Sequence, residues 1–343
     1  MSSKFSNAVL KWYKHNGRYD LPWKTKDAYK LWISEIMLQQ TQVKTVIPYY
    51  KTFIKKYPNL KKLANANYDD LMLIWSGLGY YRRLDNVYKS SKIIMKEHNG
   101  KFPNNFKDIL SLPGIGRTTA SAIYTFAGFG HKAILDGNVK RIIRRFFDIV
   151  PGIKKTSLEK LLWEKSTHIT PTNKNTSNFN QAMMDIGSSI CTRGKPKCNI
   201  CPLKSIGCHY KHENITKEKE PQRIINKKKY LAVIIDSKKR IFLEKIQKGR
   251  LWRNLYSSPS FISKKNEIKW ITNKNIPISK ESKQISIQHK VTNKLFDIIA
   301  SFYFLKNNKK VSLSTHNWYN LSNINVGIPK YQEKIINIYI END

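Results

Sequence analysis

Two carboxylates lie in sequence surroundings that could give them a role in catalysis. Glu35 lies in the segment Trp32–Val43, WISEIMLQQTQV, beside apolar side chains that recur at helical spacing. A carboxyl group at the margin of an apolar wall can have its pKa raised, which suits a general acid. The second carboxylate, Asp136, follows the short apolar run Ala133–Leu135 and precedes Gly137. From the helix pattern alone Glu35 is more simply a solvated surface glutamate, so other motifs must decide its role.

A glycine-rich turn precedes Asp136 in the chain. The turn Leu112–Gly116, LPGIG, can close tightly because glycine tolerates positive φ and lets another backbone approach. Small and apolar residues at helical spacing follow it, from Thr119 to Ala127. The turn should therefore present the free N–H groups of a helix N-terminus, which stabilise phosphate. Alone, such a turn usually only connects two helices. Because a carboxylate follows it in the sequence, the turn suggests a protein that acts on DNA.

All four cysteines of the chain fall in one short segment, with the spacing Cys191-x6-Cys198-x2-Cys201-x6-Cys208. Clustered thiols in a reducing compartment more often bind metal than form disulfides. Two ligands two residues apart can hold one metal centre from a tight turn, and the outer pair can close the loop around it. Four thiolates fit either tetrahedral zinc or a [4Fe–4S] cluster, and the spacing does not choose between them.

The chain has 343 residues and a formal net charge of +38, from 62 Lys and Arg against 24 Asp and Glu. A chain of this length more often holds two domains than one. So strong a positive field attracts polyanions, usually nucleic acid, although a coding bias toward Lys, Asn and Ile would give the same excess without selection for binding. No signal peptide and no apolar run of about 18 residues is visible, so we expect a soluble intracellular protein of the cytoplasm, with no membrane contact.

Helical periodicity dominates the chain as far as the cysteines. Asp27 is a plausible N-cap for a helix that runs through Gln40. Further helices are predicted over 43–54, 68–75, 84–95 and 106–110, and one after Asp136 with Val139, Ile142, Ile143 and Phe146 on its apolar face. These helices would have to bring Glu35 and Asp136 to the same place.

The composition changes after the cysteines. The charged, poorly apolar segment 213–229 indicates a linker between a domain of residues 1–212 and a second domain of residues 230–343. In the second domain, strands are predicted over 230–236, 240–246 and 295–305, and Ile335, Ile336 and Ile338 indicate a closing helix. The pattern predicts a small α+β domain.

Three motifs together are specific enough to indicate a family. The glycine turn followed by LDGNVKR at Leu135–Arg141, the segment Trp32–Val43, and NFNQAMMDIGSSICTRGKPKC from Asn178 resemble the helix-hairpin-helix DNA glycosylases of the endonuclease III superfamily. The closest match is the MutY-type adenine glycosylases. The resemblance implies a mostly α N-terminal helix-hairpin-helix glycosylase domain with an iron–sulfur loop, plus a smaller α+β Nudix-like C-terminal domain. It also implies that Glu35 protonates adenine at N7 and that Asp136 stabilises the oxocarbenium ion on the sugar.

The same resemblance assigns contacts with DNA. It places Gln39, Gln40 and Thr41 around the lesion or in the base stack, and it makes Tyr80, in the turn SGLGYYRR, the wedge that kinks the duplex. By itself, a tyrosine packed in a helical core fits Tyr80 equally well. The remaining DNA-binding candidates are Gly114, Gly116 and Thr118 in the hairpin, Lys140, and Thr292 and Asn293 in the second domain. Lys140, four residues after Asp136, could neutralise that carboxylate, hold a phosphate or belong to a solvated charged face. Asp185 is a candidate DNA-proximal or helix-capping carboxylate.

One departure from the family concerns the cysteines. The family's last interval has five residues, whereas six separate Cys201 from Cys208, and Gly207 can absorb the extra one. The resemblance therefore still implies a [4Fe–4S] cluster held by Cys191, Cys198, Cys201 and Cys208, rather than zinc or an empty site.

A second departure concerns lesion recognition. Gly249–Trp252, Leu255–Tyr256 and Pro259 resemble the Nudix-like domain, but no acid-rich hydrolase helix follows them, so no nucleotide hydrolysis is expected. Where the family reads 8-oxoguanine with a Phe-Ser-His turn, this chain has Val291, Thr292 and Asn293. Discrimination of the lesion is therefore expected to be weaker.

The motifs favour a monofunctional DNA glycosylase that excises adenine mispaired with 8-oxoguanine or guanine, acting as a monomer on double-stranded DNA. One alternative is an endonuclease III-type glycosylase and lyase for oxidised pyrimidines, but such enzymes place a nucleophilic lysine where Thr118 stands, and a threonine cannot form a Schiff base. Another alternative is a non-catalytic DNA-binding or redox-sensing relative, in which both carboxylates would be dispensable.

Overall fold

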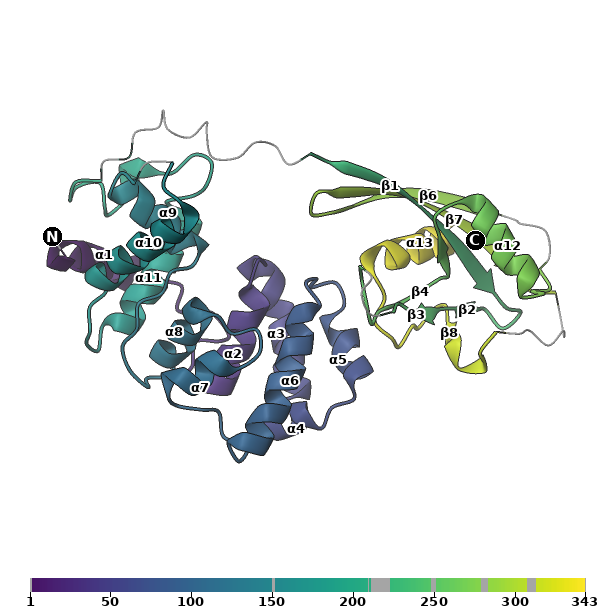
Figure 1. Ribbon diagram of the computed structural model, residues 1–343, viewed down its shortest axis with the longest axis horizontal. Helices are drawn as coiled ribbons and strands as arrows, with labels where there is room; N and C mark the ends of the chain where they lie inside the picture. The colour runs from purple at the N-terminus through teal and green to yellow at the C-terminus, as the bar shows by residue number, and fades with distance from the viewer. Residues whose placement is uncertain are drawn as a thin grey trace. The chain divides into compact units, whose positions relative to one another are not determined.

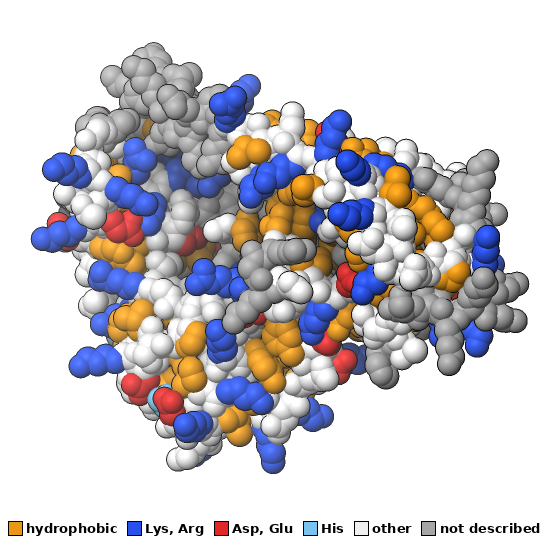
Figure 2. All heavy atoms as spheres, turned by 45° about the vertical axis from the view of Figure 1, so that its right-hand side comes forward, with side chains coloured by type: hydrophobic (Ala, Val, Ile, Leu, Met, Phe, Trp, Pro, Cys, Tyr) orange, Lys and Arg blue, Asp and Glu red, His pale blue; other side chains and the backbone are white. Residues whose placement is uncertain are grey.

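The computed structural model describes residues 2–149, 152–208, 210, 223–247, 251–278, 283–306 and 313–342. The chain forms two compact units, and Figure 1 labels most of their helices and strands. The first unit comprises Met1–Asn65 and Asp85–Glu220, and the second comprises Ala66–Leu84 and Pro221–Asp343. Figure 2 shows Lys and Arg side chains spread over the face it presents, with Asp and Glu sparse among them. Among the described residues, no helix is long and apolar enough to cross a membrane.

The first unit is helical. Its elements are α1 (Ser2–Asn16), α2 (Ala28–Leu38), α3 (Val43–Lys56), α4 (Leu60–Ala64), most of α6 (Arg82–Glu97), α7 (Phe106–Ser111), α8 (Arg117–Phe126), α9 (Gly137–Phe146), α10 (Lys155–Ile169), α11 (Thr176–Ser189) and the short 3-10 helix η1 (Cys198–Ile200). The predicted helices over 43–54, 84–95 and 106–110 are confirmed as α3, α6 and α7, each at most two residues longer at either end.

Helix α2 begins where the sequence predicts and ends earlier. The Asp27 side chain accepts hydrogen bonds from the main-chain N–H groups of Tyr29 and Lys30 and so caps the helix. The helix stops at Leu38 rather than Gln40, because the backbone of Gln40 takes a left-handed φ of 57°. The apolar side chains of α2 are buried, so the core holds this helix in place.

One hydrophobic cluster joins the helix after Asp136 to the helix before the cysteines. Phe5 of α1, Phe146 of α9 and Phe179 of α11 pack in it, and the ring centroids of Phe5 and Phe146 are 4.7 Å apart. Full burial of an apolar side chain of this kind stabilises the fold by about 1.5–3 kcal/mol. The cluster therefore fixes α9, and the Asp136 that precedes it, against α11.

The second unit is built on a mixed sheet in the order β6-β7-β1-β2-β8, with β5 also paired to β1 and with β3 and β4 in a separate two-stranded sheet. Its elements are α5 (Tyr68–Trp75), β1 (Ile225–Ile235), β2 (Arg240–Phe242), β3 (Glu244–Lys245), β4 (Tyr256–Ser257), β5 (Ser260–Phe261), α12 (Lys264–Asn273), β6 (Lys283–Val291), β7 (Lys294–Phe304), the 3-10 helix η3 (Thr315–Asn317), β8 (Trp318–Asn320) and α13 (Lys330–Glu341).

Two helices cover opposite faces of this sheet. Tyr339 of α13 stacks on Phe302 of β7, with ring centroids 4.6 Å apart. Lys264 of α12 donates a hydrogen bond of 3.0 Å to the hydroxyl of Tyr303, the next residue of the same strand. Because successive side chains of a strand point to opposite faces, the sheet lies between α12 and α13. The α+β class predicted for this domain agrees with the described residues.

The strands differ in detail from the prediction. β1 begins at Ile225, inside the segment expected to be a linker up to 229, because its backbone pairs in parallel with β7 from Ile225 opposite Lys294 onward. The start of this strand is polar and exposed, so no alternating pattern marks it. The predicted strand 240–246 is divided into β2 and β3 at Leu243, and β6 and α12 had no clear sequence signal. The strand at 295–305 and the closing helix are confirmed as β7 and α13.

Candidate active site

The glycine turn has the geometry that its sequence predicts. Gly114 has a φ of 80°, and a Cβ atom built there would lie 2.5 Å from Nδ2 of Asn86, so only glycine fits without strain. Gly116 is the N-cap of α8 and is exposed, with open space where a Cβ would be. No side chain at this cap accepts a hydrogen bond from the first N–H groups of α8. An anion could therefore bind those groups.

A cation stands at the same helix end. The guanidinium carbon of Arg117, the first residue of α8, lies 3.9 Å from the ring centroid of Trp163. The stacked ring restricts the arginine and keeps its charge beside the open N–H groups of the helix. Sequence reasoning did not single out Arg117, although its position directly after Gly116 was the available signal.

Asp136 is the N-cap of α9. Its Oδ1 accepts a hydrogen bond of 2.7 Å from the main-chain N–H of Val139, and its Oδ2 accepts one of 3.3 Å from Nδ2 of Asn138. Both oxygens are thus oriented by the first turn of the helix. The hydroxyl of Thr118, on α8, donates a hydrogen bond of 3.1 Å to the carbonyl of Leu135, so the hairpin helix is tied to the backbone that delivers Asp136.

The electrostatics of the two carboxylates are coupled. Burial raises the pKa of Glu35 to about 8, and the negative charge of Asp136 acts in the same direction. Burial also raises the pKa of Asp136, but hydrogen bonds from Val139 and Asn138 and the charge of Arg141 oppose that rise. Near neutral pH, Glu35 therefore holds a proton, while Asp136 has several partners that favour its ionised form. This is the division of roles that a general acid and a charge-stabilising anion require.

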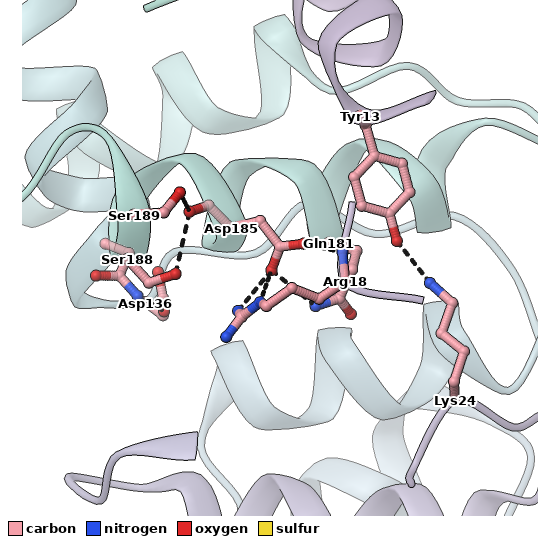
Figure 3. Close-up of polar contacts among 9 residues, drawn as sticks. Tyr13, Arg18, Lys24, Asp136, Gln181, Asp185, Ser188 and Ser189 are labelled. Carbon is pink, nitrogen blue, oxygen red and sulfur yellow. Dashed lines mark hydrogen bonds and ion pairs between the residues drawn. The ribbon is translucent and has the colours of Figure 1, made fainter. Parts of the chain in front are cut away.

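An ion pair joins α11, which precedes the cysteine loop, to the segment that follows α1. Asp185 is 2% exposed and accepts hydrogen bonds from the Arg18 main-chain N–H at 3.1 Å and from its side-chain Nε at 2.8 Å. Figure 3 shows the Arg18 side chain extended toward Asp185. Near this pair, the Lys24 ammonium donates a hydrogen bond to the Tyr13 hydroxyl. The sequence left Asp185 as either a DNA-proximal or a helix-capping carboxylate; because it lies in the interior of α11, it does not cap that helix.

Side chains of α9 connect Asp136 to the cysteine loop. Arg141 donates hydrogen bonds to Oδ1 of Asn138 at 2.8 Å, to the carbonyl of Gly187 at 2.5 Å and to the carbonyl of Cys191 at 2.7 Å. A Cβ atom on Gly187 would clash with the Cβ of Asn138, so α11 can approach the start of α9 only with glycine there. Asn138 and Arg141 belong to the motif Leu135–Arg141, but their roles could not be read from it.

The four cysteines line one cavity. Its wall also contains Ile142, Arg145, Ile190, Pro196, Leu203 and Tyr210. Burial raises the pKa of the Cys201 thiol to about 11 and also raises that of Cys208, so a bound metal centre would be needed to hold them as thiolates. Among the residues that the structure describes, no three His, Cys, Asp or Glu side chains are gathered around one point for a single metal ion.

A half-buried cation lies beside one of the cysteine sulfurs. The Arg145 guanidinium donates hydrogen bonds to Sγ of Cys191 at 3.3 Å and to the carbonyl of Thr192 at 2.7 Å. The ring of Tyr210 packs against it, with its centroid 4.5 Å from the guanidinium carbon. A cationic donor beside a cysteine sulfur, in an otherwise apolar cavity that the four cysteines line, fits a negatively charged thiolate-ligated centre.

The remaining candidates of the first unit surround these groups. Nε2 of Gln39 lies 3.4 Å from the hydroxyl of Thr119 and 3.5 Å from the carbonyl of Gly114, so it links the end of α2 to the hairpin. Gln40 is exposed with its left-handed backbone, and Thr41 follows it with its hydroxyl 3.5 Å from the Gln39 carbonyl. Lys140 pairs with Glu159 of α10, with an Nζ to Oε2 distance of 2.6 Å, rather than with Asp136.

In the second unit, Tyr80 is 48% exposed on a turn with a φ of 49°. The interpretation of Tyr80 as a core residue is therefore wrong. Thr292 is exposed at the turn between β6 and β7, with a φ of 53°, and Asn293 follows it. The predicted Nudix-like motif includes Gly249 and Arg250, which lie outside the described residues; its Trp252 is buried.

Comparison with known proteins defines the class first. Residues 33–168 match the family model of the HhH-GPD superfamily base excision DNA repair proteins, and this span holds Glu35, the hairpin and Asp136. A thermostable thymine-DNA glycosylase structure matches with a TM-score of 0.55 and 29% identity, over 61% of this chain and 95% of that one. Endonuclease III in a non-covalent complex with DNA matches with a TM-score of 0.52 and 20% identity, over 60% and 92%. The helical unit therefore has the fold of the helix-hairpin-helix base excision glycosylases.

Named relatives, two of which align with nearly the whole chain, narrow this class. The adenine DNA glycosylase of Buchnera aphidicola subsp. Schizaphis graminum is 43% identical over 98% of this chain and 98% of its own length. That of Buchnera aphidicola subsp. Baizongia pistaciae is also 43% identical, over 97% and 95%. The Mus musculus enzyme is 36% identical over 59% of this chain and 41% of its own. The chain belongs to the adenine DNA glycosylase family.

Proposed function

We propose that this protein is a monofunctional DNA glycosylase that excises adenine mispaired with 8-oxoguanine or guanine, as a step of base excision repair. The observation that carries the proposal is that burial, and after it the negative charge of Asp136, raises the pKa of Glu35 to about 8. Family membership over the whole chain supports adenine as the base removed.

The two carboxylates divide the reaction between them. The target nucleotide must first leave the base stack, at a cost of a few kcal/mol that contacts with the DNA backbone offset. Glu35 then donates its proton to N7 of adenine, which makes the base a neutral leaving group when the N-glycosidic bond breaks. The electron pair of that bond stays with the base, and Asp136 stabilises the positive oxocarbenium ion on the sugar. Water, directly or after a transient adduct with Asp136, completes the hydrolysis.

Strand cleavage is not part of this reaction. A lyase of this superfamily needs an amine nucleophile, whereas the corresponding residue here is Thr118, whose hydroxyl is already donated to the Leu135 carbonyl. A hydroxyl cannot form the Schiff base on which the lyase step depends. The product is therefore an abasic site in an intact strand, and the alternative of an endonuclease III-type lyase is disfavoured.

The cysteine cavity is proposed to hold a [4Fe–4S] cluster through Cys191, Cys198, Cys201 and Cys208. The cluster would crosslink the loop after α11 and make it rigid. Together with Arg145, it would also form a charged protrusion beside α9. Purified protein should contain about four irons per chain, and Cys201→Ser should lower the iron content and the melting temperature together. Stoichiometric zinc without iron would contradict this assignment.

The C-terminal domain, residues 230–343, is proposed to be Nudix-like and to read the base opposite adenine, with Thr292 and Asn293 at the tip of the β6–β7 hairpin. The hairpin glycines, Thr118, the segment Gln39–Thr41 and Lys140 are proposed to contact the DNA backbone or the lesion. We further propose that the protein acts as a monomer inside the cell, on duplex DNA.

A single-turnover assay tests the function. Duplexes containing adenine opposite 8-oxoguanine, guanine or thymine are incubated with excess protein, and strand breaks are measured with and without heat and alkali. We expect breaks for the first two duplexes only after heat and alkali, and none for the third. Glu35→Gln should lower the excision rate by a factor of at least about 100 while binding of the duplex is retained. Full activity in that variant would remove Glu35 from the mechanism.

A further inference from the structure

The turn that carries Tyr80 is braced by a buried arginine. Arg83 is 7% exposed, and its Nη2 donates hydrogen bonds to the carbonyls of Leu78 at 3.3 Å and Gly79 at 3.0 Å. Its guanidinium carbon lies 5.3 Å from the centroid of the Tyr80 ring and 5.7 Å from that of Trp75. Arg83 is therefore an internal support for the turn rather than a surface phosphate contact. The exposed Tyr80 ring therefore extends from a turn whose backbone is held by the hydrogen bonds of Arg83.

The helix that leads into this turn is held by the C-terminal part of the same unit. Asp69, in the first turn of α5, pairs with Nζ of Lys245 at 2.5 Å and accepts a hydrogen bond of 3.1 Å from the hydroxyl of Tyr256. Lys245 and Tyr256 lie directly opposite each other in the pair β3–β4. One carboxylate of α5 is thus held by both strands of that small sheet.

Two further contacts extend this docking along α5. A Cβ atom on Gly327 would lie 2.9 Å from the carbonyl oxygen of Met72, so the two backbones approach closely. The hydroxyl of Ser76, at the C-cap of α5, donates a hydrogen bond of 2.6 Å to the carbonyl of Ile328. Asp69, Met72 and Ser76 are three and four residues apart, which places them along one side of the helix. Tyr80 follows Ser76 by four residues.

We propose that Asp69 and Lys245 are positioning residues for Tyr80. Through them the C-terminal domain sets the position of α5 and of the braced turn, and so the depth at which the Tyr80 ring enters the base stack beside the mispair. The inference rests on the proposed function, in which Tyr80 is the wedge and the C-terminal domain reads the opposite base. Recognition of that base and insertion of the wedge are then linked by one rigid connection.

A charge-swap series tests the link. The variants are Asp69→Lys, Lys245→Asp and the double variant that restores the pair in reverse, with Lys238→Asp as a control of equal charge change at an exposed turn residue of the same unit. Insertion of the wedge is followed by the fluorescence of 2-aminopurine placed next to 8-oxoguanine. Excision is measured in single turnover opposite 8-oxoguanine and opposite guanine.

We expect each single reversal to lower the fluorescence change and to reduce the ratio of the two excision rates about threefold to fivefold, the size set by a part-exposed ion pair. The double variant should recover to within about twofold of the unaltered protein, and the control should keep its ratio. Unchanged fluorescence and ratio in the single reversals, or no recovery in the double variant, would overturn the proposal. Failure of the proposed function looks different, because the unaltered protein would then excise no adenine at all.

Discussion

The hydroxyl of Thr118 donates a hydrogen bond of 3.1 Å to the main-chain carbonyl of Leu135, one residue before Asp136. This bond joins the helix that follows the glycine turn to the backbone that delivers the Asp136 carboxylate. Thr118, which in the proposed function takes the place of the nucleophilic lysine of a lyase, is therefore also part of the support for Asp136. Its replacement should affect both stability and the geometry of the site.

Thr118→Val keeps the shape of the side chain and removes the donor, so the Leu135 carbonyl loses its partner. We expect the free energy of unfolding to fall by about 1–3 kcal/mol, the cost of an unsatisfied buried group. Thr118→Ser keeps the hydroxyl, so its free energy of unfolding should fall by less than about 1 kcal/mol. Urea denaturation of the two variants measures the difference. Equal stability of the valine and serine variants would show that the hydrogen bond contributes nothing.

The rate of adenine excision should depend on pH through Glu35. Burial and the charge of Asp136 raise the pKa of Glu35 to about 8, so the proton needed at N7 is present below that pH and absent above it. Single-turnover rates should fall about tenfold per pH unit above about pH 8, and should fall again at acidic pH, where Asp136 becomes protonated. The residual activity of Glu35→Gln should lack this basic limb. The same limb in that variant would assign it to another group.

Stability should respond to the same proton. Because the pKa of Glu35 is raised from 4.5 in the unfolded chain to about 8 in the fold, the folded state binds the extra proton. This contribution to stability is complete below the unfolded value and is lost as the pH rises through the folded value. Thermal melting over a range of about pH 5 to 9 should show a smaller decline for Glu35→Gln than for the unaltered protein. Parallel declines would mean that Glu35 is already ionised at neutral pH.

Asp136 has two separable roles, as the cap of α9 and as a negative charge. Asparagine is a good N-cap, so Asp136→Asn should change the free energy of unfolding by no more than about 0.5 kcal/mol. Asp136→Ala removes the acceptor of the hydrogen bond from Val139, so it should lower the free energy of unfolding by about 1 kcal/mol. Both variants should lose excision. In Asp136→Asn the pKa of Glu35 should also fall, because one cause of its elevation is removed. Titration of Glu35 by NMR measures this shift, and an unchanged pKa would show that the two carboxylates do not interact.

Several helices of the first unit were predictable because burial imposes a period on their sequences, whereas α1, α4 and α10 were not predicted. The stripe through Trp32, Ile33, Ile36 and Met37 and the cap at Asp27 are enough to specify α2 from the local sequence. The four cysteines and the glycine turn were recognisable for a similar reason, since few alternatives satisfy such spacings. By contrast, the start of β1 was not predictable, because exposed polar residues enter the sheet only through backbone pairing with β7.

The fine structure of the site depends on contacts between distant segments. The pair of Arg18 and Asp185 joins residues 167 apart, and the close approach of Gly187 to Asn138 is set by how α9 and α11 pack. Neither leaves a local pattern. The capping role of Asp136 did have a signal, namely an acidic residue immediately before an amphipathic helix. The pKa of Glu35 depends on burial and on Asp136, so the sequence could suggest its direction but not its size.

The two hairpin glycines should differ in what they tolerate, although both belong to the same short turn. Gly114→Ala must place a side chain at a φ of 80° and against Asn86, so we expect it to lower the free energy of unfolding by at least about 1 kcal/mol. Gly116→Ala meets open space at a φ of −90° and should change stability by less than about 0.5 kcal/mol.

DNA binding should distinguish Gly114→Ala from Gly116→Ala as well, and here Gly116→Ala is the variant that should be impaired. A methyl group at Gly116 would stand at the entrance to the N–H groups of α8, so Gly116→Ala should weaken binding of an uncleavable duplex while the fold stays intact. Gly114→Ala with Asn86→Ala relieves the clash but not the backbone strain, and should recover only part of the lost stability. Chemical denaturation and a fluorescence anisotropy titration give the two readouts. Normal DNA affinity in Gly116→Ala would mean that the open end of α8 is not where the phosphate binds.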